Sequence, residues 1–338
     1  MKKLEDNVYN QELERSDPKF KLWRSVGLML TYECNCSCEF CYYHCSPQKG
    51  GLMSKDTLLG AWDGLKKIAG DSAKIHITGG EPFLYFGHLV DILRKAQTQK
   101  IGMIDLLETY GFCAENNSIT QKRLKLLDKL NLRRLKISCD PFHQEYVDIE
   151  PVRKLAGIAE DILGADRVMV RWRDYLDNPI DLKNMPEEQR KEFYIKTMRD
   201  YPPRFTGRAA EKLAPLLASD SIKQISKLNC SRTFLAAKGV HIDPFGNVFS
   251  GTCSGIIVGN VTKQPLDEMW SRFSPYQDYI IKTLFEKGPA GLLEYAHDYG
   301  YVPENSCAGK CHLCSSVKQF LIDKGLLEDT IGPRECYR

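Results

Sequence analysis

The hydrophobic residues of the chain fall into short runs, separated by segments in which apolar positions recur every three or four residues. The runs have the length of β-strands, and the segments between them have the period of amphipathic helices. The runs of strand length are residues 25–32, 73–79, 104–111, 132–140 and 166–172. The helical segments that follow them are residues 58–70, 88–97, 120–130, 151–163 and 186–200. Five consecutive strand-then-helix units predict an α/β fold with a parallel sheet that winds toward a barrel.

The alternation stops at "DYPPRF", residues 200–205, where paired prolines end the last helix of the series. Further along, "VHID" and "NVFS" alternate around a Pro-Phe-Gly turn and predict a β-hairpin over residues 240–250. We therefore expect an N-terminal extension at 1–24, a partial barrel at 25–205 and a smaller α+β domain at 206–338.

Composition narrows the class of protein. The net charge of +3 comes from 47 basic and 44 acidic residues that are well mixed, which argues against a nucleic-acid partner. No run of about 18 apolar residues and no signal-peptide pattern occurs, so we expect a cytoplasmic protein without a membrane partner. Thirteen cysteines in a reducing compartment suit metal binding better than disulfides. A secreted enzyme with scattered disulfides is the alternative.

Five of the cysteines lie in "TYECNCSCEFCYYHC", residues 31–45, directly after the first predicted strand. The spacing of Cys34, Cys38 and Cys41 lets a short loop wrap three thiolates around an iron-sulfur cluster. A fourth iron then stays open for a non-protein ligand, provided that neither Cys36 nor Cys45 supplies it. We expect Cys36 to point away from the cluster and Cys45 to be a shielding or free thiol. A zinc site or incidental thiols are the alternatives.

At these residues the chain resembles the radical S-adenosylmethionine (SAM) superfamily. The shared features are the C-x3-C-x2-C loop after the first strand, an aromatic residue before the third cysteine, and "GGEP" after the second strand. The resemblance implies a partial (β/α)6 TIM-like barrel in which a four-iron four-sulfur cluster binds SAM at its open iron. It assigns the cluster to Cys34, Cys38 and Cys41, the aromatic position to Phe40, and the contact with the SAM amino group to Gly79, Gly80, Glu81 and Pro82.

Three further residues lie where the barrel strands end. Ser138 fits the position that contacts the SAM ribose in many family members, although a strand-ending serine is as often a cap. Thr109 in "ETYGF" is similar to a Thr-Asn-Gly segment of the family, with tyrosine in place of asparagine. Arg171 could bind the SAM carboxylate through two parallel hydrogen bonds, or form an ion pair at the barrel rim.

The C-terminal region resembles the SPASM and twitch extensions of radical SAM enzymes. The shared features are a cysteine before the hairpin, the turn "IDPFGNV", a cysteine after it, and a short "LDEMW" helix. Such extensions bind auxiliary four-iron four-sulfur clusters, and we expect one here. The candidate ligands are Cys230, Cys253, Cys307, Cys311, Cys314 and Cys336, among which Cys230, Cys253, Cys311 and Cys314 are preferred. A structural zinc site is the alternative, and His312 is expected to face solvent.

If the resemblance holds, an electron donor such as flavodoxin or ferredoxin reduces the first cluster. SAM is then cleaved to a 5'-deoxyadenosyl radical that abstracts hydrogen from a substrate carbon. Oxidative modification of a peptide or protein side chain is the leading prediction, and a small metabolite is the alternative substrate. No winged-helix module is evident before residue 25, which favours a small molecule or a separately chaperoned substrate. A non-catalytic iron-sulfur or zinc protein is the non-enzyme alternative.

Overall fold

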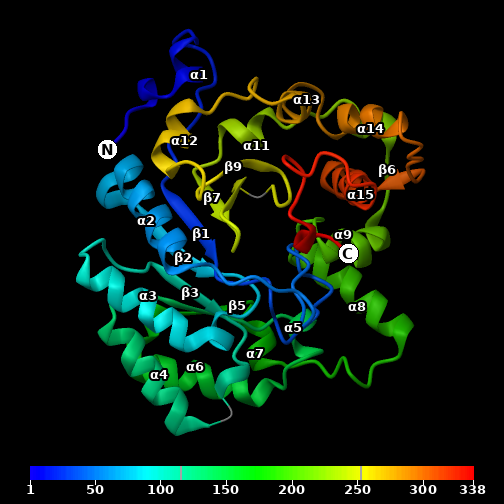
Figure 1. Ribbon diagram of the computed structural model, residues 1–338. Coiled ribbons are helices and arrows are strands. Elements are labelled where there is room, and N and C mark those ends of the chain that lie inside the picture. The colour runs from blue at the N-terminus through cyan, green and yellow to red at the C-terminus, as the bar shows by residue number, and fades with distance from the viewer. Residues whose placement is uncertain (115, 252) are drawn as a thin grey trace.

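The computed structural model describes residues 1–114, 116–251 and 253–338 (Figure 1). The five predicted strand-then-helix units are all present, and the prediction of an α/β fold with a parallel sheet is confirmed. Their strands are β1 (Ser25–Met29), β2 (Lys74–Thr78), β3 (Leu106–Thr109), β4 (Leu135–Ser138) and β5 (Val168–Arg171). Their helices are α2 (Lys55–Ala69), α3 (Phe86–Thr98), α4 (Asn117–Lys129), α6 (Ile149–Leu163) and α8 (Glu187–Asp200).

Local sequence explains where these elements begin and which face they bury. Helix α2 begins after Ser54, whose side chain accepts a hydrogen bond from the Thr57 amide. In β2 the side chains of Ile75 and Ile77 are buried, while His76 between them is only half-buried. The same alternation in β3 and β4 gives the sheet one apolar face and one face that carries polar side chains. The polar face surrounds the candidate site described below.

The predicted hairpin forms from β7 (Gly239–Ile242) and β8 (Asn247–Ser250), which pair in antiparallel fashion. Its position was not predicted. Strand β7 pairs in parallel with β1, and the sheet has the order β5-β4-β3-β2-β1-β7-β8-β9, in which β9 is Ile257–Asn260. The sixth parallel strand therefore lies beside β1 and comes from the C-terminal region, outside the range 25–205 that the sequence pattern assigned to the partial barrel.

The remaining elements surround this sheet. Figure 1 shows α2, α3, α4 and α6 along one side, and the C-terminal helices around the other end. Those C-terminal elements are α9 (Arg208–Lys212), α10 (Ile222–Ile225), α11 (Ser231–Leu235), α12 (Leu266–Arg272), α13 (Tyr279–Lys287), α14 (Pro289–His297) and α15 (Lys310–Asp323), with the short pair β6 (Asp220–Ser221) and β10 (Ser306–Cys307). Short helices α1 (Val8–Gln11), α5 (Pro141–Gln144) and α7 (Asp174–Asp177) complete the chain.

Residues 1–24 do not stand apart from the C-terminal region. The side chain of Asn7 donates to the Trp270 carbonyl at 2.7 Å, and the Trp270 indole donates to the Lys21 carbonyl at 3.1 Å. The "LDEMW" segment forms α12, as predicted, and packs against α2. The domain boundaries at residues 25 and 206 stay a prediction.

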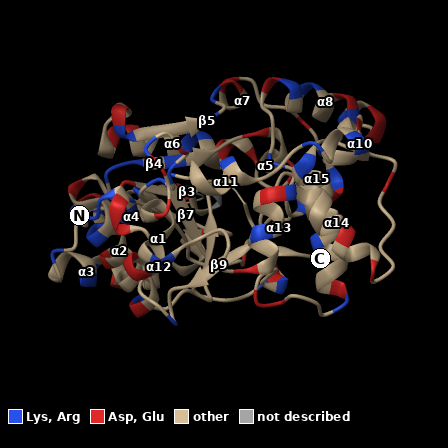
Figure 2. Cartoon of the chain, turned by 90° about the horizontal axis from the view of Figure 1, so that it is seen from above, with Lys and Arg blue, Asp and Glu red and all other residues tan. Residues whose placement is uncertain are grey.

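Basic and acidic residues alternate along the outer helices, in agreement with the mixed charge of the sequence (Figure 2). Within the described part of the chain, no helix combines the length and the apolar character that crossing a bilayer requires.

Candidate functional site

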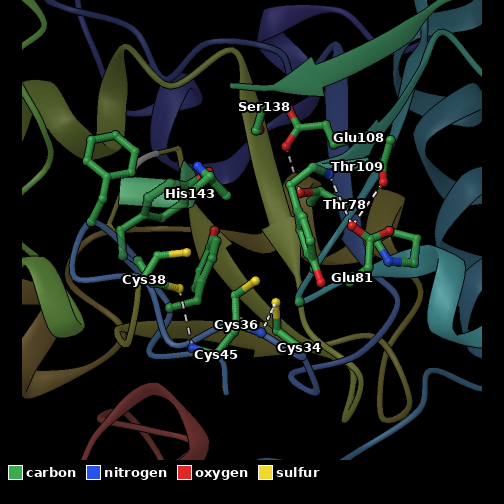
Figure 3. Close-up of a pocket in the computed structure, with 18 of the residues that line it drawn as sticks. Cys34, Cys36, Cys38, Cys45, Thr78, Glu81, Glu108, Thr109, Ser138 and His143 are labelled. Atoms are coloured by element: carbon green, nitrogen blue, oxygen red, sulfur yellow. Dashed lines mark hydrogen bonds between the residues drawn. The ribbon is translucent and has the colours of Figure 1, made fainter. Parts of the chain in front are cut away.

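The first cysteine loop begins where β1 ends and folds back on itself. The Cys34 amide donates to the Ser46 carbonyl at 3.1 Å, and the Cys41 amide donates to the Cys38 carbonyl at 3.1 Å. Cys34, Cys38 and Cys41 line one pocket, in which Figure 3 labels Cys34 and Cys38. The same pocket is lined by all the other residues predicted for the SAM site: Phe40, Gly79, Gly80, Glu81, Pro82, Thr109, Ser138 and Arg171. Residues from five separate loops and strands thus meet at one edge of the sheet.

Backbone contacts fix the Gly-Gly-Glu turn against the cysteine loop. The Gly80 amide donates to the Thr31 carbonyl at 2.7 Å, and the Glu81 amide donates to the Glu33 carbonyl at 3.0 Å. A Cβ atom at Gly80 would lie 1.9 Å from the Glu33 carbonyl oxygen. The glycine is therefore required by the close approach of two backbone segments, which places the turn beside the thiols.

Glu81 is fully buried and accepts three hydrogen bonds. The donors are the Phe83 amide at 2.9 Å, the Thr109 hydroxyl at 2.9 Å and the Tyr110 amide at 3.1 Å. Burial raises the pKa of Glu81 to about 7, although these hydrogen bonds act in the opposite direction. A carboxylate has about four acceptor sites, so Glu81 keeps room for about one further donor.

Arg171 contributes a positive charge to the pocket that also contains Glu81. Its guanidinium lies over the Phe40 ring at 5.1 Å and over the Trp172 ring at 4.5 Å. No carboxylate of the described residues forms an ion pair with it within 4.0 Å, so the rim ion pair considered from the sequence is not present. The pocket therefore presents a carboxylate and a guanidinium, which together match the charges of an amino acid group.

Sequence reasoning missed a charged network on the polar face of the sheet. Glu108, which also lines the pocket, lies 2.9 Å from His76 and 2.5 Å from Lys136, and it accepts from Thr78 at 3.0 Å. Burial alone would raise the pKa of Glu108, but His76 and Lys136 hold it well below its usual value. The strand patterns "KIHIT", "LLET" and "LKIS" carry these polar residues at every second position, and this signal could have revealed them.

A second missed feature is the pair of Asp140 and His143 in the segment after β4. The two side chains lie 2.7 Å apart, and Asp140 is fully buried while His143 lines the pocket. Burial would lower the pKa of His143, yet the Asp140 carboxylate raises it above its usual value. The pocket therefore contains an imidazole held in a fixed orientation by a buried carboxylate.

The expectation that Cys36 points away from the ligand thiols is wrong. It lines the same pocket as Cys34 and Cys38 (Figure 3), and its backbone amide donates to the Cys34 sulfur at 3.4 Å. The Cys45 amide donates to the Cys41 sulfur at 3.3 Å in a similar way. The chain turns tightly between residues 34 and 41, so strict alternation of side-chain direction does not hold there.

Cys34, Cys38 and Cys41 are the residues that would hold an iron-sulfur cluster in this pocket. Among the described residues, no three His, Cys, Asp or Glu side chains converge as the ligands of one metal ion would. Each cysteine ligand of a four-iron cluster binds a different iron, so its ligand thiols stand apart around one cavity. Cys34, Cys38 and Cys41 occupy three positions of one loop and all line the same pocket.

The six candidate cysteines of the C-terminal region divide into groups. Cys230 precedes α11, Cys253 follows β8, and Cys311 and Cys314 lie on α15. Burial, followed by the charges of Cys314 and Cys311, raises the pKa of Cys230 to about 12. Burial also raises the pKa of Cys253, and the charges of Cys314, Cys230 and Cys311 act in the same direction. The choice of these four cysteines as ligands stays a prediction.

The other two candidates have different surroundings. Cys307 lies on β10, near Glu304 and Asp220. Cys336 contacts the Tyr32 hydroxyl at 3.1 Å, next to the first cysteine loop. The expectation that His312 faces solvent is wrong, because it is 4% exposed and its Nδ1 accepts from the Ala308 amide at 3.1 Å.

Comparison with known proteins agrees with the pocket. Residues 28–165 match the family model of the Radical SAM superfamily. A match to this model implies SAM and a four-iron four-sulfur cluster as the cofactors of residues 28–165. The putative peptide biosynthesis protein YydG of Bacillus subtilis (strain 168) is 25% identical over 140 residues. That match covers 39% of this chain and 40% of the length of the relative.

Three solved structures are also similar. BtrN in complex with AdoMet and 2-DOIA is 16% identical with a TM-score of 0.47, covering 80% of this chain and 90% of that one. Polyhistidine-tagged anSMEcpe with bound AdoMet is 15% identical with a TM-score of 0.45, covering 88% and 92%. Streptococcus suis SuiB bound to S-adenosylmethionine is 11% identical with a TM-score of 0.38, covering 97% and 80%. Likeness at this level carries no conclusion about function.

Proposed function

We propose that the chain is a radical SAM oxidoreductase that modifies a peptide or protein side chain. The observation that carries this proposal is the single pocket that combines Cys34, Cys38 and Cys41 with Glu81 and Arg171. When bound there, the cluster and SAM supply a 5'-deoxyadenosyl radical that abstracts a hydrogen atom from a substrate carbon.

The residues of the pocket have separate tasks in this proposal. The three cysteines bind the cluster as thiolates. Glu81 accepts a hydrogen bond from the SAM ammonium through its remaining acceptor site, and Arg171 donates to the SAM carboxylate. Stacking of Phe40 on Phe142, with ring centroids 5.2 Å apart, places aromatic surface at this pocket and helps to exclude water.

One feature supports a peptide as the substrate, and a second feature supports an oxidative modification. The relative YydG is described as a putative peptide biosynthesis protein. The second thiol group, Cys230, Cys253, Cys311 and Cys314, supports an auxiliary cluster of the kind found in SPASM and twitch extensions. Such a cluster would accept the electron that a carbon radical loses when the product is more oxidised than the substrate.

Cleavage of SAM tests the catalytic part of the proposal. Anaerobically reconstituted protein is reduced with dithionite, and 5'-deoxyadenosine and iron are measured. We expect product from the wild type and none from the Cys34→Ala, Cys38→Ala, Cys41→Ala triple variant, which keeps the iron of the second group. A Cys139→Ala variant, which removes a buried thiol outside both groups, serves as the matched control and should match the wild type. Iron binding by the wild type without SAM cleavage would contradict the proposal.

Deuterium transfer tests the substrate class. An extract of cells grown in deuterated medium is separated into a peptide fraction and a small-metabolite fraction, and each is added to the reaction. Abstraction from a deuterated substrate puts deuterium into 5'-deoxyadenosine, which mass spectrometry detects. Enrichment with the peptide fraction supports the proposal, whereas enrichment with the small-metabolite fraction alone would reject a peptide substrate.

A further inference from the structure

Two of the basic residues in the described part of the chain are buried, Arg208 at 7% exposure and Lys318 at 3%. Neither forms an ion pair with a carboxylate of the described residues. The Arg208 guanidinium donates to the carbonyl oxygens of Cys38 and Cys45, each at 2.9 Å. The Lys318 ammonium donates to the Ser254 carbonyl at 2.6 Å. Each buried cation therefore lies at one of the two thiol groups.

Lys318 is placed against the second thiol group by two elements. On α15, Cys311, Cys314 and Lys318 are separated by three and four residues, so they share one face of the helix. The carbonyl that Lys318 binds belongs to Ser254, the residue after Cys253. The ammonium also lies over the Tyr337 ring, 5.9 Å from its centroid, and the charges of Tyr337, Cys314, Cys253 and Cys336 all act on it.

A buried ammonium whose partners are one carbonyl oxygen and one aromatic ring is unfavourable unless negative charge lies nearby. Protonated thiols do not supply that charge. Four thiolates that bind an iron-sulfur cluster do supply it, because their combined charge exceeds the positive charge of the cluster core. The buried lysine is thus explained if the second thiol group holds an anionic cluster.

We propose that Lys318 is the charge partner of an auxiliary iron-sulfur cluster bound by Cys230, Cys253, Cys311 and Cys314, and that it raises the reduction potential of this cluster. The inference rests on the auxiliary cluster of the proposed function. A positive charge beside a cluster stabilises its reduced, more negative state. Lys318 is therefore a positioning and tuning residue for electron acceptance.

The same lysine is linked to the first cysteine loop through Ser254. The Ser254 hydroxyl donates to the Tyr42 carbonyl of the first cysteine loop at 3.1 Å. Figure 1 shows the end of the chain, coloured red, beside the loop that follows β1. Ser254 therefore contacts both the Lys318 ammonium and the first cysteine loop.

The test isolates the second cluster. Lys318→Met, Lys318→Arg and Lys324→Met are made in the Cys34→Ala, Cys38→Ala, Cys41→Ala background, and iron content and midpoint potential are measured by redox titration with electron paramagnetic resonance. Lys324 is exposed at the end of the same helix and provides the matched loss of charge. We expect Lys318→Met to shift the potential to more negative values or to lose iron, Lys318→Arg to restore it, and Lys324→Met to change neither.

Stability of the metal-free chain provides a second readout. If Lys318 serves the cluster, Lys318→Met should leave the metal-free chain as stable as its parent or more stable, because it removes an unmatched buried charge. Loss of folding in the metal-free Lys318→Met chain would overturn the inference, since the lysine would then be a structural residue. Equal potentials in Lys318→Met and Lys324→Met, or a redox-silent zinc ion in the second group, would also overturn it. These measurements do not require SAM cleavage, so failure of the catalytic proposal is recognised separately.

Discussion

Replacement of Gly80 by alanine is the sharpest test of how the site is built. The added Cβ would lie 1.9 Å from the carbonyl oxygen and 2.5 Å from the carbonyl carbon of Glu33. Both are backbone atoms, so no side-chain rotation relieves the contact. An ordinary contact begins at 3.4 Å, so the two segments must separate by about 1.5 Å. The hydrogen bonds from the Gly80 and Glu81 amides would then be lost.

The cost follows from these two effects. Overpacking costs about 1–3 kcal/mol, and two lost hydrogen bonds cost about 1 kcal/mol each. We expect Gly80→Ala to lower the free energy of unfolding by about 3–5 kcal/mol and to reduce the iron bound at Cys34, Cys38 and Cys41. Urea unfolding followed by circular dichroism measures the first effect, and iron analysis measures the second.

Gly60→Ala is the matched control. Gly60 is exposed within α2, and a Cβ there would meet nothing within 4 Å. Alanine should stabilise the helix by about 0.5–1 kcal/mol, because glycine is a poor helix former. If Gly80→Ala unfolds at the same urea concentration as the wild type and binds as much iron, the close approach of the two segments does not position the turn.

Three further predictions concern other parts of the molecule. Burial lowers the pKa of His241 from 6.5 to about 4, so below pH 6.5 the unfolded chain takes up a proton that the folded chain does not. The free energy of unfolding should therefore fall by about 3 kcal/mol between pH 6.5 and 4, and urea titrations should show no such component in His241→Gln. Arg171→Lys should weaken SAM binding about 10–100-fold in equilibrium dialysis, since it loses the planar fork and the stacking; unchanged affinity would remove Arg171 from the site. Cys314→Ala should lower the iron content, whereas Cys307→Ala should not, and the reverse result would reject the preferred set of four cysteines.

The local sequence pattern was sufficient to predict the strands and helices. It was also sufficient to predict the edge of the sheet at which the candidate site lies. Strand-length runs and helical periods gave the five units, and the carboxyl ends of parallel strands meet at one edge. The loop with Cys34, the turn with Glu81 and the strand end with Arg171 could therefore be expected to meet. They meet because parallel strands place their carboxyl ends at one edge of the sheet, and the alternation of strands and helices in the sequence predicts that arrangement.

Other features depend on contacts between distant residues or on tight loop geometry. The pairing of β7 with β1 joins segments far apart in the chain, and no local pattern marks it. The position of Cys36 results from turns within the loop, and the burial of Lys318 results from packing of α15 against the C-terminal segment. The polar face with Glu108 is different, because its two-residue alternation was visible in the sequence and was not used.

The place of β1 in the sheet has a consequence for how the protein is made. β1 pairs with β2 on one side and with β7 on the other, and four of its five residues are buried. During synthesis the ribosome releases β1 long before β7, so one edge of an apolar strand stays open while the chain between them emerges. A chain cut at residue 205 would keep that edge permanently, next to the cysteine loop. Expression of the first 205 residues alone should therefore give a protein that pairs edge to edge and aggregates.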